Sequence, residues 1–132
     1  MTEHESVKLA AKTFLSKMSS WERRSLNLFR SGRQHQEKVL QELRDIYDTH
    51  LTKKAAGRKQ ARYGLAAFDD PPYFEQEITS IEATSDGGYW VEIPEGMFGK
   101  VRLHFVNEDG AWKIDFKESE VDEGKWKKLL DI

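Results

Sequence analysis

Apolar residues recur at steps of three and four along the first half of the chain, which is the spacing of one face of an α-helix. A first stripe ends before Ser31-Gly32, where the glycine predicts a helix end. A second stripe follows, and a polar stretch with alanines over residues 53–62 predicts a short third helix. The first stripe comprises Val7, Ala10, Ala11, Phe14, Leu15, Met18 and Trp21, and the second comprises Val39, Leu40, Leu43, Ile46, Tyr47 and Leu51.

In the second half the spacing changes to the alternation that is typical of β-strands. The Asp-Asp-Pro-Pro sequence at residues 69–72 ends any helix, because proline donates no backbone hydrogen bond and restricts the residue before it. Strands are predicted over residues 73–84 and 89–93, joined by an Asp-Gly-Gly turn. Ile78 and Ile81 differ in parity, so we expect a bulge or a strong bend in the first of these strands.

The last two strands carry apolar triplets that we expect to face each other. The two triplets share a face only if the two residue numbers in each cross-strand pair add to an odd number, such as 217. This matching leaves a loop from Asn107 to Gly110 and puts the charged residues on the opposite side of the sheet. The expected pairs are Val101 with Phe116, Leu103 with Ile114 and Phe105 with Trp112, and the residues expected on the opposite side are Arg102, His104, Lys113, Asp115 and Lys117.

These elements define an α+β protein in which N-terminal helices pack on a curved antiparallel sheet. Helices are expected over about residues 5–65, the sheet over about residues 73–118, and a short C-terminal helical turn over about residues 123–131. At 132 residues the chain has the size of one ordinary domain. We therefore expect a single domain over residues 1–132.

Composition restricts the chemistry that the chain can perform. It has no cysteine, which excludes disulfides, thiolate metal sites and cysteine nucleophiles. Its mean hydropathy is −0.74 and no leader pattern opens it, so we expect a cytoplasmic protein without a membrane span. Residues 1–68 carry 14 Lys and Arg against 7 Asp and Glu, whereas residues 69–132 carry 7 against 16. The predicted helices are therefore basic and the predicted sheet is acidic.

The order of a long helix, shorter helices and a curved sheet resembles the nuclear transport factor 2-like superfamily, whose fold is a cone. The Gly-Ala-Trp-Lys-Ile sequence at residues 110–114 carries this resemblance. The Asp-Asp-Pro-Pro-Tyr stretch at residues 69–73, with the charged helical half, is similar to the immunity proteins of bacterial polymorphic toxin systems that share the fold. This resemblance implies a non-catalytic protein that binds and neutralises a cognate protein toxin.

A cone-shaped fold also implies an interior pocket, which leaves a small-molecule-binding protein or a ketosteroid isomerase-like enzyme as alternatives. The inward triplets offer no acid or base, so we assign no catalytic residue. Tyr47 fits an aromatic at the edge of the core as well as a pocket group. The residues expected to line a pocket are Tyr47, Tyr63, Phe105, Trp112 and Ile114.

The four histidines show no ligand spacing, so we expect no metal and no cofactor. The basic run from Lys53 to Arg62 would give a cationic helix stripe of the kind that contacts phosphates. The acidic second half argues against a polyanionic partner, and a solvated helix face explains the run better, since charge runs usually form such faces. We therefore do not expect nucleic acid binding.

Acidic residues on and beside the predicted strands suggest a basic protein partner, because a negative patch steers a positive one into place. Charges that keep strand edges soluble fit the same pattern. A homodimer through the outer sheet face is a third alternative. The residues expected to bind the partner are Glu75, Glu77, Glu92 and Glu95.

Overall fold

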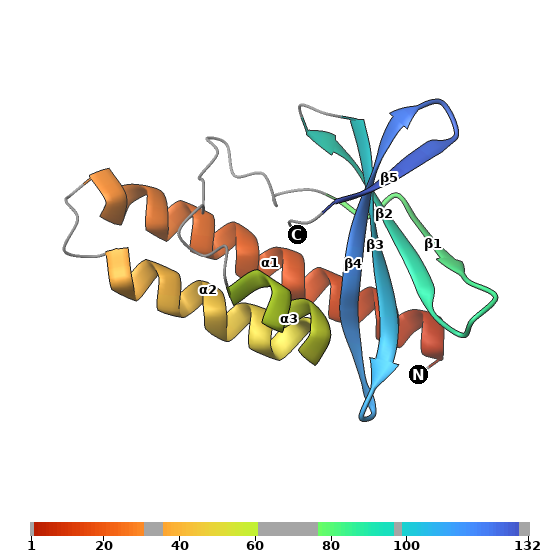
Figure 1. Ribbon diagram of the computed structural model, residues 1–132, viewed down its shortest axis with the longest axis horizontal. Coiled ribbons are helices and arrows are strands. Elements are labelled where there is room, and N and C mark those ends of the chain that lie inside the picture. The colour runs from red at the N-terminus through yellow and green to blue at the C-terminus, as the bar shows by residue number, and fades with distance from the viewer. Residues whose placement is uncertain (1, 31–35, 61–76, 97–98, 130–132) are drawn as a thin grey trace.

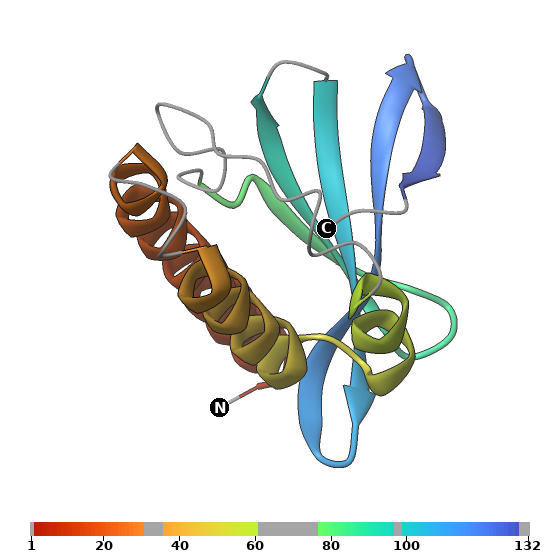
Figure 2. The same ribbon diagram turned by 60° about the vertical axis from the view of Figure 1, so that its left-hand side comes forward.

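The computed structural model describes residues 2–30, 36–60, 77–96 and 99–129, and within them helices precede an antiparallel sheet whose strands pair in chain order (Figure 1). The predicted α+β class is confirmed. The two long helices lie side by side on one side of the sheet (Figures 1 and 2). The elements are α1 (Glu3–Arg30), α2 (Gln36–His50), α3 (Lys53–Gln60), β1 (Ser80–Ala83), β2 (Tyr89–Gly96), β3 (Gly99–Glu108), β4 (Ala111–Asp122) and β5 (Lys125–Leu129).

The helices follow the predicted stripes, and polar contacts fix their ends and their pairing. The Thr2 hydroxyl oxygen accepts a hydrogen bond from the Glu5 backbone N–H at 3.1 Å, which caps α1. The buried Trp21 indole N–H donates to the Val39 carbonyl at 2.9 Å and so joins α1 to α2. Because this bond satisfies the one polar atom of a buried indole, it fixes how the two helices are set against each other.

The apolar helix stripes and one face of the sheet form a single buried cluster. Phe14 and Met18 of α1 meet Ile93, Leu103 and Phe105 of the central strands there, all at most 2% exposed. Side chains of this size each gain roughly 1.5–3 kcal/mol by leaving water. This burial fixes which face of the sheet is inward, and we call that face the inner face.

The β1–β2 hairpin is regular from Ser80 to Ala83, but just before it the Thr79 N–H donates to the carbonyl of Glu92, the residue that pairs with Ser80, at 2.8 Å. Two residues there oppose one, which is the bulge expected between Ile78 and Ile81. β1 begins only at Ser80, and its four residues pair with β2 without a shift of register. Gly88 follows the turn and comes so close to β3 that an added Cβ would lie 2.7 Å from the Phe105 carbonyl oxygen. A glycine is therefore required at this position.

The β3–β4 register also differs from the expected one. The turn between the strands has two residues, Asp109 and Gly110, with φ of 54° and 86°, as a type I′ turn requires. Glu108 therefore pairs with Ala111, and Phe105 pairs with Ile114 instead of Trp112. The expected four-residue loop was wrong because the Asp-Gly turn closes the hairpin earlier.

A β-bulge at Asp115 then changes which residues of β4 face inward. Phe105 pairs with Ile114 and His104 pairs with Phe116, so Asp115 is the extra residue that β4 inserts between these two pairs. Beyond the bulge, Lys117 pairs with the inward Leu103 and is buried, whereas Phe116 lies on the opposite, outer face. The expected inward position of Phe116 and the expected outward position of Lys117 are both wrong for this one reason.

The C-terminal helical turn expected over residues 123–131 is a strand instead. β5 pairs with the second half of β4, from Lys117↔Leu129 to Asp122↔Lys125, and forms an edge of the sheet. Its Lys-Trp-Lys-Lys sequence is suited to this position, since edge lysines discourage pairing with another chain. The end of the expected helical part, residues 61–65, and the start of the expected sheet, residues 73–76, lie outside the described residues.

Substitution of Phe14 by alanine tests the packing of the core. Phe14 is fully buried and its ring lies 5.8 Å from that of His50. Phe14→Ala is expected to lower the free energy of unfolding by about 3–5 kcal/mol in urea titrations, because it leaves a cavity. Leu9→Ala on the same helix is the control, since Leu9 is 54% exposed and should change stability by less than about 0.5 kcal/mol. Equal losses in both variants would contradict the assignment of the core.

Candidate functional site

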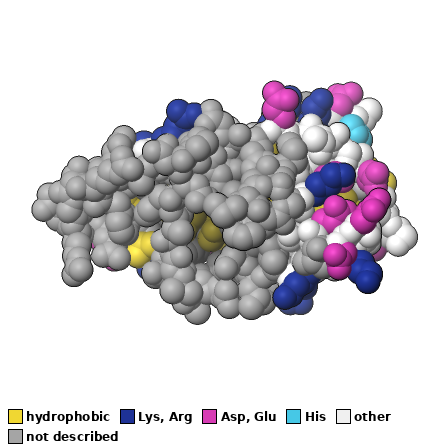
Figure 3. Space-filling view, turned by 90° about the horizontal axis from the view of Figure 1, so that it is seen from above, with side chains coloured by type: hydrophobic (Ala, Val, Ile, Leu, Met, Phe, Trp, Pro, Cys, Tyr) yellow, Lys and Arg dark blue, Asp and Glu magenta, His cyan; other side chains and the backbone are white. Residues whose placement is uncertain are grey.

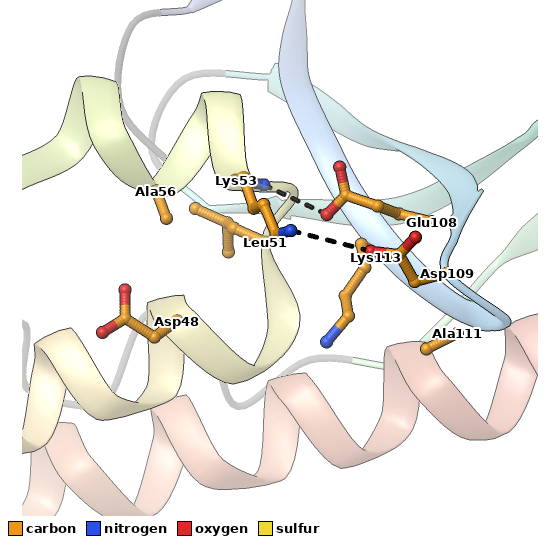
Figure 4. Close-up of a pocket in the computed structure, with 8 residues that line it drawn as sticks. All are labelled: Asp48, Leu51, Lys53, Ala56, Glu108, Asp109, Ala111 and Lys113. Atoms are coloured by element: carbon orange, nitrogen blue, oxygen red, sulfur yellow. Dashed lines mark hydrogen bonds and ion pairs between the residues drawn. The ribbon is translucent and has the colours of Figure 1, made fainter.

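A pocket lies where the β3–β4 hairpin meets the end of α2 and the start of α3 (Figure 4). Charged side chains of both signs surround a small apolar floor. Its lining residues are Asp48, Leu51, Lys53, Ala56, Glu108, Asp109, Ala111 and Lys113.

The charged groups of this pocket contact one another and its walls. The Lys53 backbone N–H donates to the Glu108 carboxylate at 3.1 Å, and the Lys53 ammonium lies 3.8 Å from the Asp109 carboxylate (Figure 4). The Lys113 ammonium donates to the Thr49 carbonyl at the end of α2. The basic start of α3 is thus engaged by the acidic hairpin of the same chain, and the pocket holds no acid–base pair set apart from solvent.

The residues expected to line an interior pocket lie elsewhere. Tyr47, Phe105 and Ile114 are buried members of the core, and Trp112 is half-buried against it. None of these four lines the pocket of Figure 4. Tyr63 lies outside the described residues.

Among the residues whose burial the structure describes, Glu22 and Lys117 are buried acidic and basic side chains, and sequence reasoning missed both. Glu22 is 2% exposed and Lys117 is 7% exposed, and each has an interaction partner. Glu22 stands four positions after Met18, so the helical period could have placed it on the inward stripe. The burial of Lys117 could not be predicted from the strand alternation, because the bulge at Asp115 moves its side chain from the outer face of the sheet to the inner face. Neither residue lines the pocket of Figure 4.

His50, at the end of α2, is a perturbed titratable group. Burial, helped by the nearby cations Lys17 and Lys113, lowers the pKa of His50 to about 4. Its Nε2 atom has no hydrogen-bond partner among the described residues. Both features favour the neutral imidazole in the folded protein.

The outer face carries a row of aromatic rings across β2, β3 and β4. The Trp90 ring lies 4.9 Å from that of His104 and 5.5 Å from that of Phe116, and the rings of His104 and Phe116 are 4.8 Å apart. His104 is buried and Nε2 lies 3.9 Å from the Asp86 carboxylate. Hydrogen bonds from the Thr84 hydroxyl and the Gly88 N–H lower the pKa of Asp86, so this carboxylate is ionised at neutral pH.

Cations stack beside these rings. The Arg102 guanidinium lies 3.8 Å from the centre of the Trp90 ring and 4.1 Å from that of the Trp126 ring, and its Nε donates to the Glu118 carboxylate at 2.9 Å. The Lys128 ammonium lies 4.4 Å from the centre of the Phe116 ring. We call the whole set the outer-face cluster, and it comprises Trp90, Arg102, His104, Phe116, Glu118, Trp126 and Lys128.

The residues expected to bind a partner lie at the β1–β2 side of the sheet where they are described. Glu92 pairs with Ser80 across the strands and lies 3.7 Å from the Lys100 ammonium, and Glu77 is exposed just before β1. Glu95 is part of β2, but its side chain is outside the description, as is all of Glu75. From above, charges of both signs gather over the sheet side of the molecule (Figure 3).

The described part of the chain holds no group of three metal-ligating side chains. A helix long and apolar enough to cross a membrane is not found there either.

The chain belongs to a family of immunity proteins: the model of the NTF2 fold immunity proteins, named after nuclear transport factor 2, matches residues 6–129. It is also 30% identical over 124 residues to the immunity protein RhsIA of Dickeya dadantii (strain 3937). The aligned region covers 89% of this chain and 90% of that protein. No solved structure matches the chain. Both resemblances drawn from the sequence are confirmed. The family is non-catalytic, so the enzyme alternative is set aside.

The low pKa of His50 predicts a pH dependence of stability. Between pH 6.5 and about 4 the unfolded chain binds a proton at this residue and the folded protein does not, so the free energy of unfolding falls as the pH falls. In urea titrations at pH 7 and pH 4.5, wild type should therefore lose more stability than His50→Gln. His4→Gln at an exposed position of α1 is the control and should behave like wild type. An equal loss in wild type and His50→Gln would contradict the low pKa.

Proposed function

We propose that this protein is the immunity partner of a polymorphic toxin system and neutralises a cognate protein toxin by binding it in the cytoplasm of the bacterium that makes both. The family match over residues 6–129 is the observation that carries this proposal. The similarity to the immunity protein RhsIA along nearly the whole of both chains supports it.

A binding role also agrees with the contacts that the charged side chains of the pocket and of the interior make within the protein. At the pocket of Figure 4 Lys53 contacts Asp109 with its ammonium and Glu108 with its backbone N–H, and the buried Glu22 and Lys117 have partners. Groups held in this way stabilise the fold and are not poised for proton transfer. The protein then acts through its surface, by covering the toxin or holding it in an inactive form.

The acidic residues beside β1 and β2 are proposed to guide the encounter. Glu77 and Glu92, with Glu75 and Glu95 near them in sequence, add negative charge to this side of the sheet. A negative patch speeds association with a basic partner and loses this effect as salt rises. The association rate should therefore fall with increasing ionic strength.

Protection on coexpression is the experiment that tests the proposed function. The gene for this chain is expressed in a host together with the toxin domain encoded by the adjacent gene. The host is expected to grow with wild-type protein and to stop growing without it, because the bound toxin is inactive. The destabilised Phe14→Ala variant, which presents the same surface groups but unfolds more readily, should protect less well as the temperature rises. Failure of wild type both to protect and to bind the purified toxin domain would refute the proposal.

A further inference from the structure

The outer-face cluster lies on the side of the sheet that faces away from α1 and α2. Trp90 stands between Tyr89 and Val91, whose side chains pack on or within the core, so strand alternation turns its ring outward. Trp90, Phe116 and Trp126 are all half-buried, and their rings contact side chains of β2 to β5. A surface centred on tryptophan and arginine has the composition of the energetic centre of a protein interface.

The cations of this face are already engaged. Arg102 is held by Glu118 and two indole rings, Lys128 by the Phe116 ring, and Lys100 by Glu92. The charges of Arg102 and Lys100 are therefore balanced by carboxylates of the same face, which leaves it little to offer a polyanion.

Acidic groups exceed the cations on this face and around it. By strand pairing, Glu82 lies opposite Trp90, and Glu120 lies opposite Trp126. Glu82 is exposed and makes no ion pair within the described part of the chain. The acidic residues of the face and its two ends are Glu82, Asp86, Glu92, Glu118, Glu120, Asp122 and Glu123, against the cations Lys100, Arg102, Lys125 and Lys128. An aromatic centre with an acidic border is complementary to a basic protein surface.

The cluster is also ordered before any partner arrives. The Arg102 guanidinium lies between two indole rings, and its side chain is only 24% exposed. Fixing a long side chain on binding costs roughly 0.5–1.5 kcal/mol, and this cost is reduced when the chain is already held. The partner therefore meets a prearranged surface.

From these observations we infer that the outer-face cluster is the surface on which a basic face of the toxin docks, with Trp126 and Trp90 as its anchors. This inference rests on the proposed function and names the surface through which it acts. It extends the expected partner-binding set from acidic residues alone to the aromatic centre between them.

Binding measurements with single variants test the assignment. The toxin domain encoded by the adjacent gene, inactivated so that it can be produced, is titrated with wild type and with Trp126→Ala. Trp126→Ala is expected to raise the Kd by roughly 30-fold or more, as loss of an anchor does. Leu9→Ala, which removes an exposed apolar side chain on α1, is the matched control and should leave the Kd unchanged.

A charge reversal keeps the test valid if Trp126→Ala folds poorly. Glu82→Lys changes only an exposed side chain beside Trp90, and it should raise the Kd by roughly five-fold or more in low salt against a basic partner. Glu5→Lys on α1 is its control.

The outcomes separate the surface from the function. If wild type binds the toxin domain and both outer-face variants bind equally well, the docking surface is wrong and the proposed function stands. If wild type does not bind, the proposed function itself fails. If light scattering shows a wild-type dimer that Trp126→Ala makes monomeric while the Kd for toxin stays the same, the face belongs to self-association and the inference is overturned.

Discussion

The bulge at Asp115 is the constraint on which the arrangement of the sheet depends. The segment between α2 and α3 lies along the first half of β4, where the Thr52 N–H donates to the Ile114 carbonyl at 2.9 Å and the Thr52 hydroxyl donates to the Asp115 carboxylate at 3.1 Å. The same hydroxyl accepts the Ala55 N–H and caps α3. Thr52 therefore links the start of a helix to the residue at which β4 changes sides, and β5 pairs with β4 only beyond that point.

This change of sides gives the two faces of the sheet different roles. Before the bulge, Ile114 closes the core against Phe105, and after it Lys117 and Ser119 continue the inner face as buried polar groups. On the outer face Phe116 and Glu118 come into line with His104 and Arg102, which completes the outer-face cluster. Without the extra residue, Phe116 would point inward, away from Lys128, and Arg102 would keep the Trp90 ring but lose Glu118.

The helices could be predicted from sequence because their apolar period is local, and the alternation of Tyr89, Val91 and Ile93 predicted β2 for the same reason. The β3–β4 register could not be obtained by matching apolar triplets, since they give no sign of the bulge at Asp115, whose carboxylate accepts a hydrogen bond from Thr52, 63 residues away in the sequence. The Asp109-Gly110 turn was visible in the sequence and would have corrected half of the register. Trp126 was expected on a helical turn because its strand exists only through pairing with β4. The acidic residues beside β1 and β2 could be read from the sequence, whereas the aromatic rings of the outer-face cluster could be placed together only once the register was known.

The tryptophan side chains offer the most direct measurement of the central claim, that the bulge creates an outer face for recognition. The chain has four tryptophans, of which Trp90 and Trp126 belong to the outer-face cluster while Trp21 and Trp112 pack in or against the core. Their indole N–H signals can be followed by NMR as unlabelled toxin domain is added. The account predicts that the signals of Trp90 and Trp126 shift or broaden while that of Trp21 stays in place. Perturbation of Trp21 or Trp112 with unchanged Trp90 and Trp126 would contradict it.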